Sequence, residues 1–93
     1  MTEVKHTPGP FFTSCPHGGT IYVEARLRGS TIQEVAAVGP TETPEQQQAN
    51  AKLFAAAPDL LALAEYMKSL IDEDCIEDMP YGMILAAIAK ATQ

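Results

Sequence analysis

The sequence is poor in the residues that most often carry chemistry or bind nucleic acid. It has no tryptophan, two cysteines and two histidines, and its 6 lysines and arginines face 12 aspartates and glutamates, for a formal net charge of −6. A phosphate backbone repels such a chain, so we expect no nucleic acid polymer as the main partner. The charge is compatible with a basic protein surface. It is also compatible with a small anionic ligand, because a few clustered arginines can dominate the potential of one site.

The sequence offers little for metal binding or catalysis. The soft metal ligands are His6, Cys15, His17 and Cys75, and they lack the paired spacing of a zinc site. A nucleophilic serine or cysteine needs a general base beside it, and histidine is the usual one. Both histidines lie near the N-terminus, so few nucleophiles of this chain could have one as a neighbour. We therefore expect a protein that is not an enzyme, with no catalytic residues, no metal and no cofactor.

Long hydrophobic runs are absent as well. The apolar runs, such as Leu60 to Ala64, are far shorter than the roughly 20 apolar residues of a membrane-spanning helix. The N-terminus also lacks the charged and apolar regions of a secretory signal. We expect a cytoplasmic protein with no membrane partner and with reduced thiols.

The length of 93 residues and the hydrophobic content of 46% predict one globular domain over residues 1–93. A chain of this size buries only about two-thirds of its unfolded surface, so its own core is thin. Because oligomerisation is a common remedy, we expect a homo-oligomer.

Residues 1–19 predict an extended arm, because they hold three prolines and three glycines and show no regular period. Phe11 and Phe12 stand side by side in this arm. We expect at least one of them to anchor the arm to the core or to a neighbouring subunit.

Residues 20–39 predict a β-hairpin, because apolar and polar side chains alternate from Ile21 to Arg28. Gly29-Ser30 is typical of a two-residue turn. That turn pairs Leu27 with Ile32 on one apolar face. The same register pairs Val23 with Ala36 and Ile21 with Val38, and it places Tyr22, Glu24, Arg26, Gln33 and Val35 on the opposite face.

Residues 43–93 predict a helical part with a break at 58. Thr43 and Gln46 form a capping-box pattern around Pro44, which predicts that a helix begins there. We expect this helix to run to about Ala57, with Ala49, Leu53, Phe54 and Ala57 on its apolar stripe. Pro58 ends it, since proline removes a helical hydrogen bond but suits the first turn of a new helix. A second helix then follows, and a third restarts at Pro80 and packs antiparallel to the second.

Together these segments predict an α+β fold. A small antiparallel β-sheet, made of the hairpin plus the N-terminal extended arm, is followed by two to three C-terminal helices packed on it. A hairpin alone is marginally stable in water, so the sheet has to gain such partners.

The candidate ligand-binding residues are Arg26, Arg28, Tyr22, Phe11 and Phe12. The two arginines and the tyrosine alternate on one face of the predicted strand, where they suit a phosphate and a base. A phenylalanine of the arm, from the same or an adjacent subunit, would give a second stacking wall. The alternative is that the arginines are solvated or paired with glutamates of the hairpin.

A second candidate surface is the acidic connector from Asp72 to Asp78. It lacks the alternating oxygen ligands and central glycine of a calcium-binding loop. A solvated loop is the plain interpretation, and a docking patch for a basic partner is the functional one.

Two segments carry a resemblance to a known group. His6 to Phe11 reads HTPGPF, and Ala49 to Leu61 reads ANAKLFAAAPDLL. Together they resemble a group of small accessory proteins of tailed phages and prophages, with an H-T-P-G-P-W/F start and an A-N-A-K/R-L-F/I-A-A-A-P-D/E-L-L helix. Phe11 stands where the group often has tryptophan.

The resemblance implies a phage protein made in the cytoplasm of an infected bacterial host, with no enzymatic activity. Small accessory phage proteins often oppose host defence, so we expect a non-enzymatic counter-defence protein. Our first hypothesis is a sponge that sequesters a small nucleotide-type immune signal. The alternative is a protein–protein antagonist of a host defence complex, similar to an anti-CRISPR protein, that uses the acidic surface. A structural or regulatory phage protein without a ligand is a third option.

Overall fold

The computed structural model describes residues 5–15 and 19–93. Within them a three-stranded antiparallel sheet precedes three α-helices, which confirms the predicted α+β class. The strands are β1 (Phe11–Ser14), β2 (Ile21–Arg26) and β3 (Ile32–Val38), and the helices are α1 (Pro44–Ala55), α2 (Ala57–Asp72) and α3 (Tyr81–Thr92), with a 3-10 turn η1 (Ile76–Asp78) before α3.

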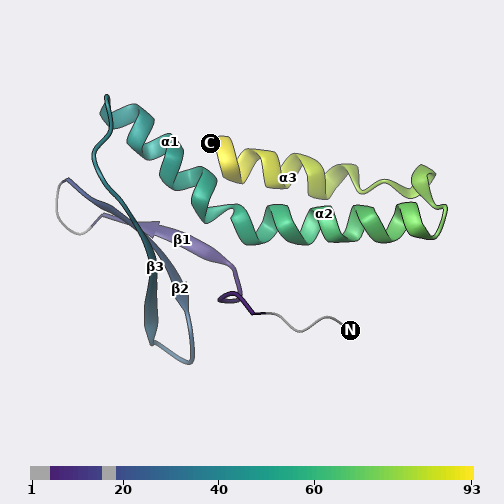
Figure 1. Cartoon of the computed structure of the whole chain (residues 1–93), viewed down its shortest axis with the longest axis horizontal. Coiled ribbons are helices and arrows are strands. Elements are labelled where there is room, and N and C mark those ends of the chain that lie inside the picture. Colours follow the sequence, from purple (N-terminus) through teal and green to yellow (C-terminus); the bar gives the residue numbers. More distant parts are fainter. Residues whose placement is uncertain (1–4, 16–18) are drawn as a thin grey trace.

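The molecule is elongated. Figure 1 shows the sheet at one end, α1 beside it, and the antiparallel α2–α3 pair extending away from it. The Cα radius of gyration is 15.4 Å, against about 12 Å for a compact chain of this length. α1 contacts all three strands and both other helices, so it joins the two halves.

The sheet has the order β1-β2-β3, with β2 in the centre. The arm supplies β1, which pairs with β2 so that Phe11 lies opposite Ala25. On the other side of β2, the predicted pairs Ile21–Val38 and Val23–Ala36 are found. The third strand gives the hairpin the support that two strands alone would lack.

The predicted pairing of Leu27 with Ile32 is wrong. A β-bulge shifts the register between Val23 and Glu24, so that Arg26 lies opposite Ile32. The turn is longer than predicted as well, since the amide of Leu27 donates to the carbonyl oxygen of Thr31 at 2.8 Å. The loop therefore has three residues, and its Gly29 has a φ of 57°, which a glycine adopts without strain.

The bulge moves two residues of β3 to the face that α1 covers. Gln33 lies opposite the fully buried Ala25 and accepts a hydrogen bond from the hydroxyl of Thr7 at 3.4 Å. Val35 lines a pocket together with Phe11. The prediction that Gln33 and Val35 share the outward face with Tyr22 is therefore wrong, because an extra residue reverses the alternation beyond it.

The core lies between the sheet and α1. It consists of Ile21, Val23 and Val38 from the sheet and Ala51 and Ala55 from α1, with Phe11 and Ala36 packed against it. The predicted stripe of α1 is wrong, because Leu53 and Phe54 are exposed. Ala51 and Ala55 lie one turn apart and have small side chains, so they let the helix approach the sheet closely.

The start of α1 is fixed by two sets of hydrogen bonds. The amide of Gln46 donates to Oγ1 of Thr43 at 3.1 Å, and Oε1 of Gln46 accepts from the amide of Glu42 at 3.2 Å. This is the predicted capping box with its return bond one residue earlier. Nε2 of Gln47 donates to the carbonyl oxygens of Gly19 and Val38, both at 2.9 Å, and so ties α1 to one end of the sheet.

The chain turns between α1 and α2 at Ala56, which caps both helices. Pro58 lies in the first turn of α2, where it has no intrahelical hydrogen bond to lose. The arm passes directly over this corner. A Cβ atom added to Gly9 would lie 2.6 Å from Cβ of Pro58, so only glycine fits there.

The contact between the arm and the corner predicts the effect of adding one methyl group. Gly9→Ala pushes the arm away from Pro58 and lowers the free energy of unfolding by about 1–3 kcal/mol. Gly39→Ala is the matched control, because no atom lies within 4 Å of the position that its new methyl group would take. Urea denaturation of both variants measures the difference. Equal stabilities of the two variants would show that the arm does not pack on the corner.

Candidate functional site

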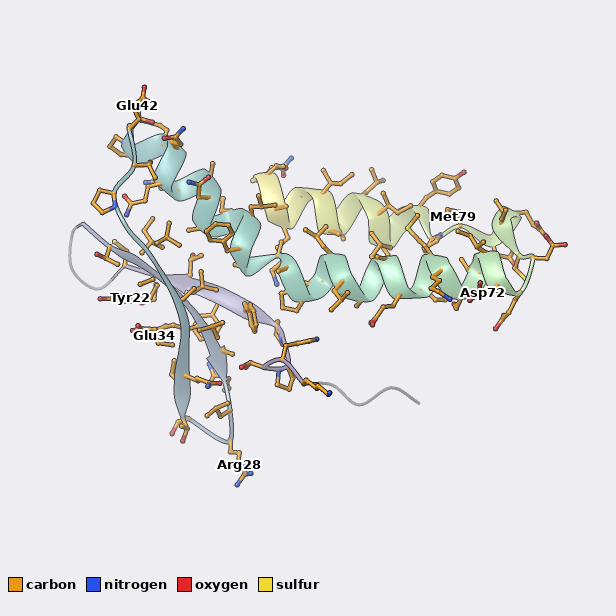
Figure 2. All side chains as sticks on the ribbon, in the orientation of Figure 1. Tyr22, Arg28, Glu34, Glu42, Asp72 and Met79 are labelled. Atoms are coloured by element: carbon orange, nitrogen blue, oxygen red, sulfur yellow. The ribbon has the colours of Figure 1, made fainter. Side chains whose placement is uncertain are left out.

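The sheet has one face without a helix, which we call the open face. Side chains alternate along each strand, and those that accompany the buried Ile21, Val23 and Ala25 face α1. The other set forms the open face: Phe12 and Ser14 of β1, Tyr22, Glu24 and Arg26 of β2, and Ile32, Glu34 and Ala37 of β3. Figure 2 shows Tyr22 and Glu34 pointing away from the helices on this side.

Three of the five predicted ligand-binding residues lie together on the open face. Phe12 lies opposite Glu24, which places it diagonal to both Tyr22 and Arg26. Diagonal neighbours on a sheet are about 7–8 Å apart at Cα, within reach of aromatic and long side chains. Phe12 and Tyr22 are half-buried, whereas Arg26 is exposed. Two aromatic rings beside a guanidinium are a suitable surface for stacking a base.

The other two predicted residues lie elsewhere. Phe11 points to the opposite face of the sheet, where it packs against the core. Arg28 lies beyond the end of β2 in the hairpin turn, and Figure 2 shows it at the tip of the hairpin. The five residues therefore do not form one cluster within a single chain.

The open face carries charges of both signs. Glu24 and Glu34 lie opposite each other beside Arg26. Of the described residues, the ion pairs join Lys68 to Asp72 and Lys90 to Asp59, so the guanidinium of Arg26 has no carboxylate partner there. The two carboxylates disfavour a polyanion along this face, and they can accept hydrogen bonds from a base or a ribose.

The two segments that carry the family resemblance meet at the corner between α1 and α2. A pocket of about 220 Å³ lies there, with residues of the arm on one side and residues of the corner on the other. Its lining is mainly apolar and consists of His6, Thr7, Phe11, Val35, Ala57, Pro58 and Leu61. Sequence reasoning missed this contact. The signal for it was Gly9 between two prolines, a position that allows close approach of another chain segment.

The acidic connector, residues 72–78, lies at the far end of the α2–α3 pair. We call this segment the acidic tip. Figure 2 shows Asp72 there, at the opposite end of the molecule from the hairpin turn. The tip includes η1 and Asp74, whose φ is 59°. Lys68 offsets one of its charges through an ion pair with Asp72 of 2.6 Å, and the hydrogen bond and charge of Asp72 raise the pKa of Lys68. Ile71 and Ile76 are exposed at or beside the carboxylates.

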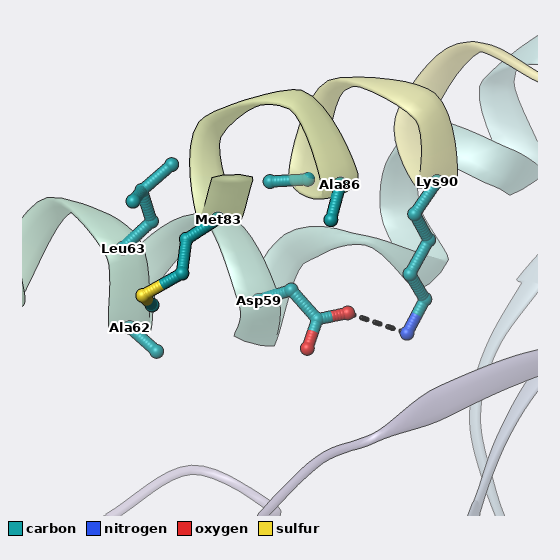
Figure 3. A pocket seen from close by; sticks show the side chains of 7 residues that line it. Asp59, Ala62, Leu63, Met83, Ala86 and Lys90 are labelled. Carbon is teal, nitrogen blue, oxygen red and sulfur yellow. Dashed lines mark ion pairs between the residues drawn. The ribbon is translucent and has the colours of Figure 1, made fainter. Parts of the chain in front are cut away.

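A shallow groove of about 350 Å³ runs between α2 and α3 (Figure 3). Small and apolar side chains line it, including Ala62, Leu63 and Met83. An ion pair of 2.5 Å between Asp59 and Lys90 closes one end and joins the start of α2 to the end of α3. The groove offers no unpaired charge for an ionic ligand, and we assign its polar residues to the packing of the two helices.

The described residues show no cluster of three or more metal-ligating side chains. His17, one of the four soft metal ligands of the sequence, lies outside the described residues. The described helices are too short or too polar to cross a membrane.

A family model described as Salmonella phage P22 protein Y8K6 matches residues 1–93. The chain belongs to this phage protein family. The predicted relationship to phage proteins is thereby confirmed. That the two sequence motifs are shared by a wider group of phage proteins stays a prediction. Searches of curated proteins and of solved structures found no match.

The opposite orientations of the two adjacent phenylalanines predict different effects of the same substitution. Phe11→Ala removes an aromatic ring from the core and lowers the free energy of unfolding by about 2–4 kcal/mol. Phe12→Ala, on the open face, lowers it by less than half as much. Urea denaturation of the two variants measures both values. A larger loss for Phe12→Ala would mean that the strand is paired in the other register.

Proposed function

We propose that this phage protein acts without catalysis and counters host defence by sequestering a small nucleotide-type signal on the open face of its sheet. The single observation that supports this function is the shared position of Phe12, Tyr22 and Arg26 on the face without a helix. Aromatic side chains on an open antiparallel sheet are an established platform for stacking bases.

The roles of the three side chains follow from their chemistry. Phe12 and Tyr22 offer ring surfaces for one base. The exposed guanidinium of Arg26 donates paired hydrogen bonds to a phosphate, and no carboxylate of the described residues neutralises it. Arg28 in the hairpin turn contributes charge from the edge of the site.

The carboxylates of Glu24 and Glu34 limit what this surface binds. They lie opposite each other on the open face, beside the aromatic residues. A long phosphate backbone would have to pass these charges, which is unfavourable. A small nucleotide avoids this, because its few phosphates reach Arg26 while the carboxylates accept from its hydroxyl or amino groups.

Thermal unfolding in the presence of nucleotides tests the proposal. Cyclic oligonucleotides and ADP-ribose-type nucleotides are added singly, with inorganic phosphate as a control for charge alone. A ligand at 100 times its Kd stabilises a protein by about 2.7 kcal/mol, which corresponds to a rise in Tm of roughly 10 °C or more for a chain of this size. We expect such a rise with at least one nucleotide and none with phosphate.

Substitutions then locate the site. Arg26→Ala and Phe12→Ala abolish the nucleotide-dependent rise in Tm. Lys68→Ala leaves it unchanged, because Lys68 lies on α2 and makes its ion pair with Asp72. No rise with any nucleotide of the series, or a rise that survives Arg26→Ala, would contradict the proposal.

A second candidate function is antagonism of a host defence protein through the acidic tip. The observation that favours it is the exposure of Ile71 and Ile76 at or beside the carboxylates. Apolar side chains surrounded by charges of one sign suit a partner surface that is basic at its rim and apolar at its centre.

Charge reversal separates this second function from the first. Replacing Glu73, Asp74, Glu77 and Asp78 by lysine removes binding to the host partner, measured as stoichiometric co-purification from bacterial lysate. Reversal of Glu42 at the start of α1 is the control for a charge reversal away from the tip. Retention of the partner by the tip variant would reject the tip as the contact, whatever the outcome of the nucleotide titrations.

A further inference from the structure

The outer side of α3 carries large apolar side chains that the described chain leaves at least half exposed. Tyr81, Leu85 and Ile88 are 72%, 68% and 50% exposed, although all three lie in one helix. Their spacing of four and then three residues places them on one side of α3, apart from the buried Ala87. We call this row the α3 seam.

The α3 seam has the pattern of a helix that packs against another helix. A spacing of four and three residues is that of the apolar positions in a heptad, and Thr92 continues it four residues after Ile88. The flanking positions Gly82 and Ala89 are small, so a partner helix can approach closely. Within α3 the single charged residue is Lys90, which pairs with Asp59 on the groove side.

We propose that the α3 seam is the contact between two copies of this chain, with α3 packed against α3 of the second copy. In a two-fold symmetric dimer the same surface patch of each copy is in contact with the other. A charged residue near the symmetry axis would therefore repel the identical residue of the second copy. The α3 seam contains no charged residue, although the chain as a whole has a formal net charge of −6, so this surface avoids that repulsion.

The accessible surface of the chain is large enough for an interface with a second copy. The accessible surface is 6725 Å², about 1,500 Å² more than the roughly 5,200 Å² of a compact monomer of 10.0 kDa. A standard interface covers about 800 Å² on each partner. This excess belongs to the whole elongated molecule, of which the α3 seam is one part, and it is sufficient for such an interface. A copy of the same chain is present wherever the protein is made.

The dimer is independent of the proposed nucleotide site. The α3 seam belongs to the helical half of the molecule, whereas the open face lies on the side of the sheet away from α1 (Figure 1). Loss of the dimer and loss of nucleotide binding are therefore separate outcomes.

Sedimentation equilibrium of the full chain tests the proposal. We expect a mass of twice 10.0 kDa for the wild type. The double substitution Leu85→Glu and Ile88→Glu forces four carboxylates into the contact and raises the dissociation constant by roughly 100-fold or more. Leu27→Glu is the matched control, because Leu27 is 49% exposed but lies beside the hairpin turn. This control variant remains dimeric.

A further variant distinguishes loss of the dimer from unfolding of the chain. Tyr81→Asp removes an aromatic ring from the α3 seam, and it places an acidic residue in the first turn of α3, which has none. An acidic side chain at that end of a helix is stabilising, so this variant keeps its helical circular dichroism while its dimer weakens. A monomeric wild type, or a dimer whose dissociation constant is unchanged in the seam variants, would overturn the proposal.

Discussion

The close approach of Gly9 to Pro58 determines how the arm is joined to the corner between α1 and α2. Pro58 lies in the first turn of α2 and turns its ring towards the arm, and only a glycine leaves room for the backbone to pass. From that point the arm continues directly into β1. The corner between α1 and α2 therefore also fixes where the first strand begins, and with it the position of Phe11 in the core.

This arrangement leaves the protein with surfaces of different character. α1 covers one face of the sheet and leaves the other without a helix, so residues of β1 and β2 are presented on an exposed and rigid support. The α2–α3 pair extends away from the sheet and carries the acidic tip at its far end. Because the core is small and the molecule elongated, many side chains of the described residues remain exposed.

The sequence predicted the fold class because its local signals were strong. The alternation from Ile21 to Arg26, the capping pattern at Thr43 and the proline in the first turn of α2 each depend on neighbouring residues only. The errors concern packing between segments. The β-bulge that moves Gln33 and Val35 has no signal in the local alternation, and the choice of Ala51 and Ala55 over Leu53 for the core depends on how closely α1 approaches the sheet.

The candidate site was predicted in part for the same reason. Tyr22 and Arg26 share a face because strand alternation requires it, and the position of Phe12 beside them depends on the pairing of β1 with β2. The separation of Arg28 from these residues results from the three-residue turn. The contact between Gly9 and Pro58, which joins residues far apart in sequence, required the structure.

A nuclear Overhauser spectrum of the isotope-labelled full chain tests the packing of the arm on the corner most directly. We expect cross-peaks between the α-protons of Gly9 and the ring protons of Pro58, because these groups are in van der Waals contact. We also expect Phe11 to show cross-peaks to the core around Val23 and Ala55. A folded protein with no cross-peak between Gly9 and Pro58 would contradict this packing, since the arm would then not lie on the corner.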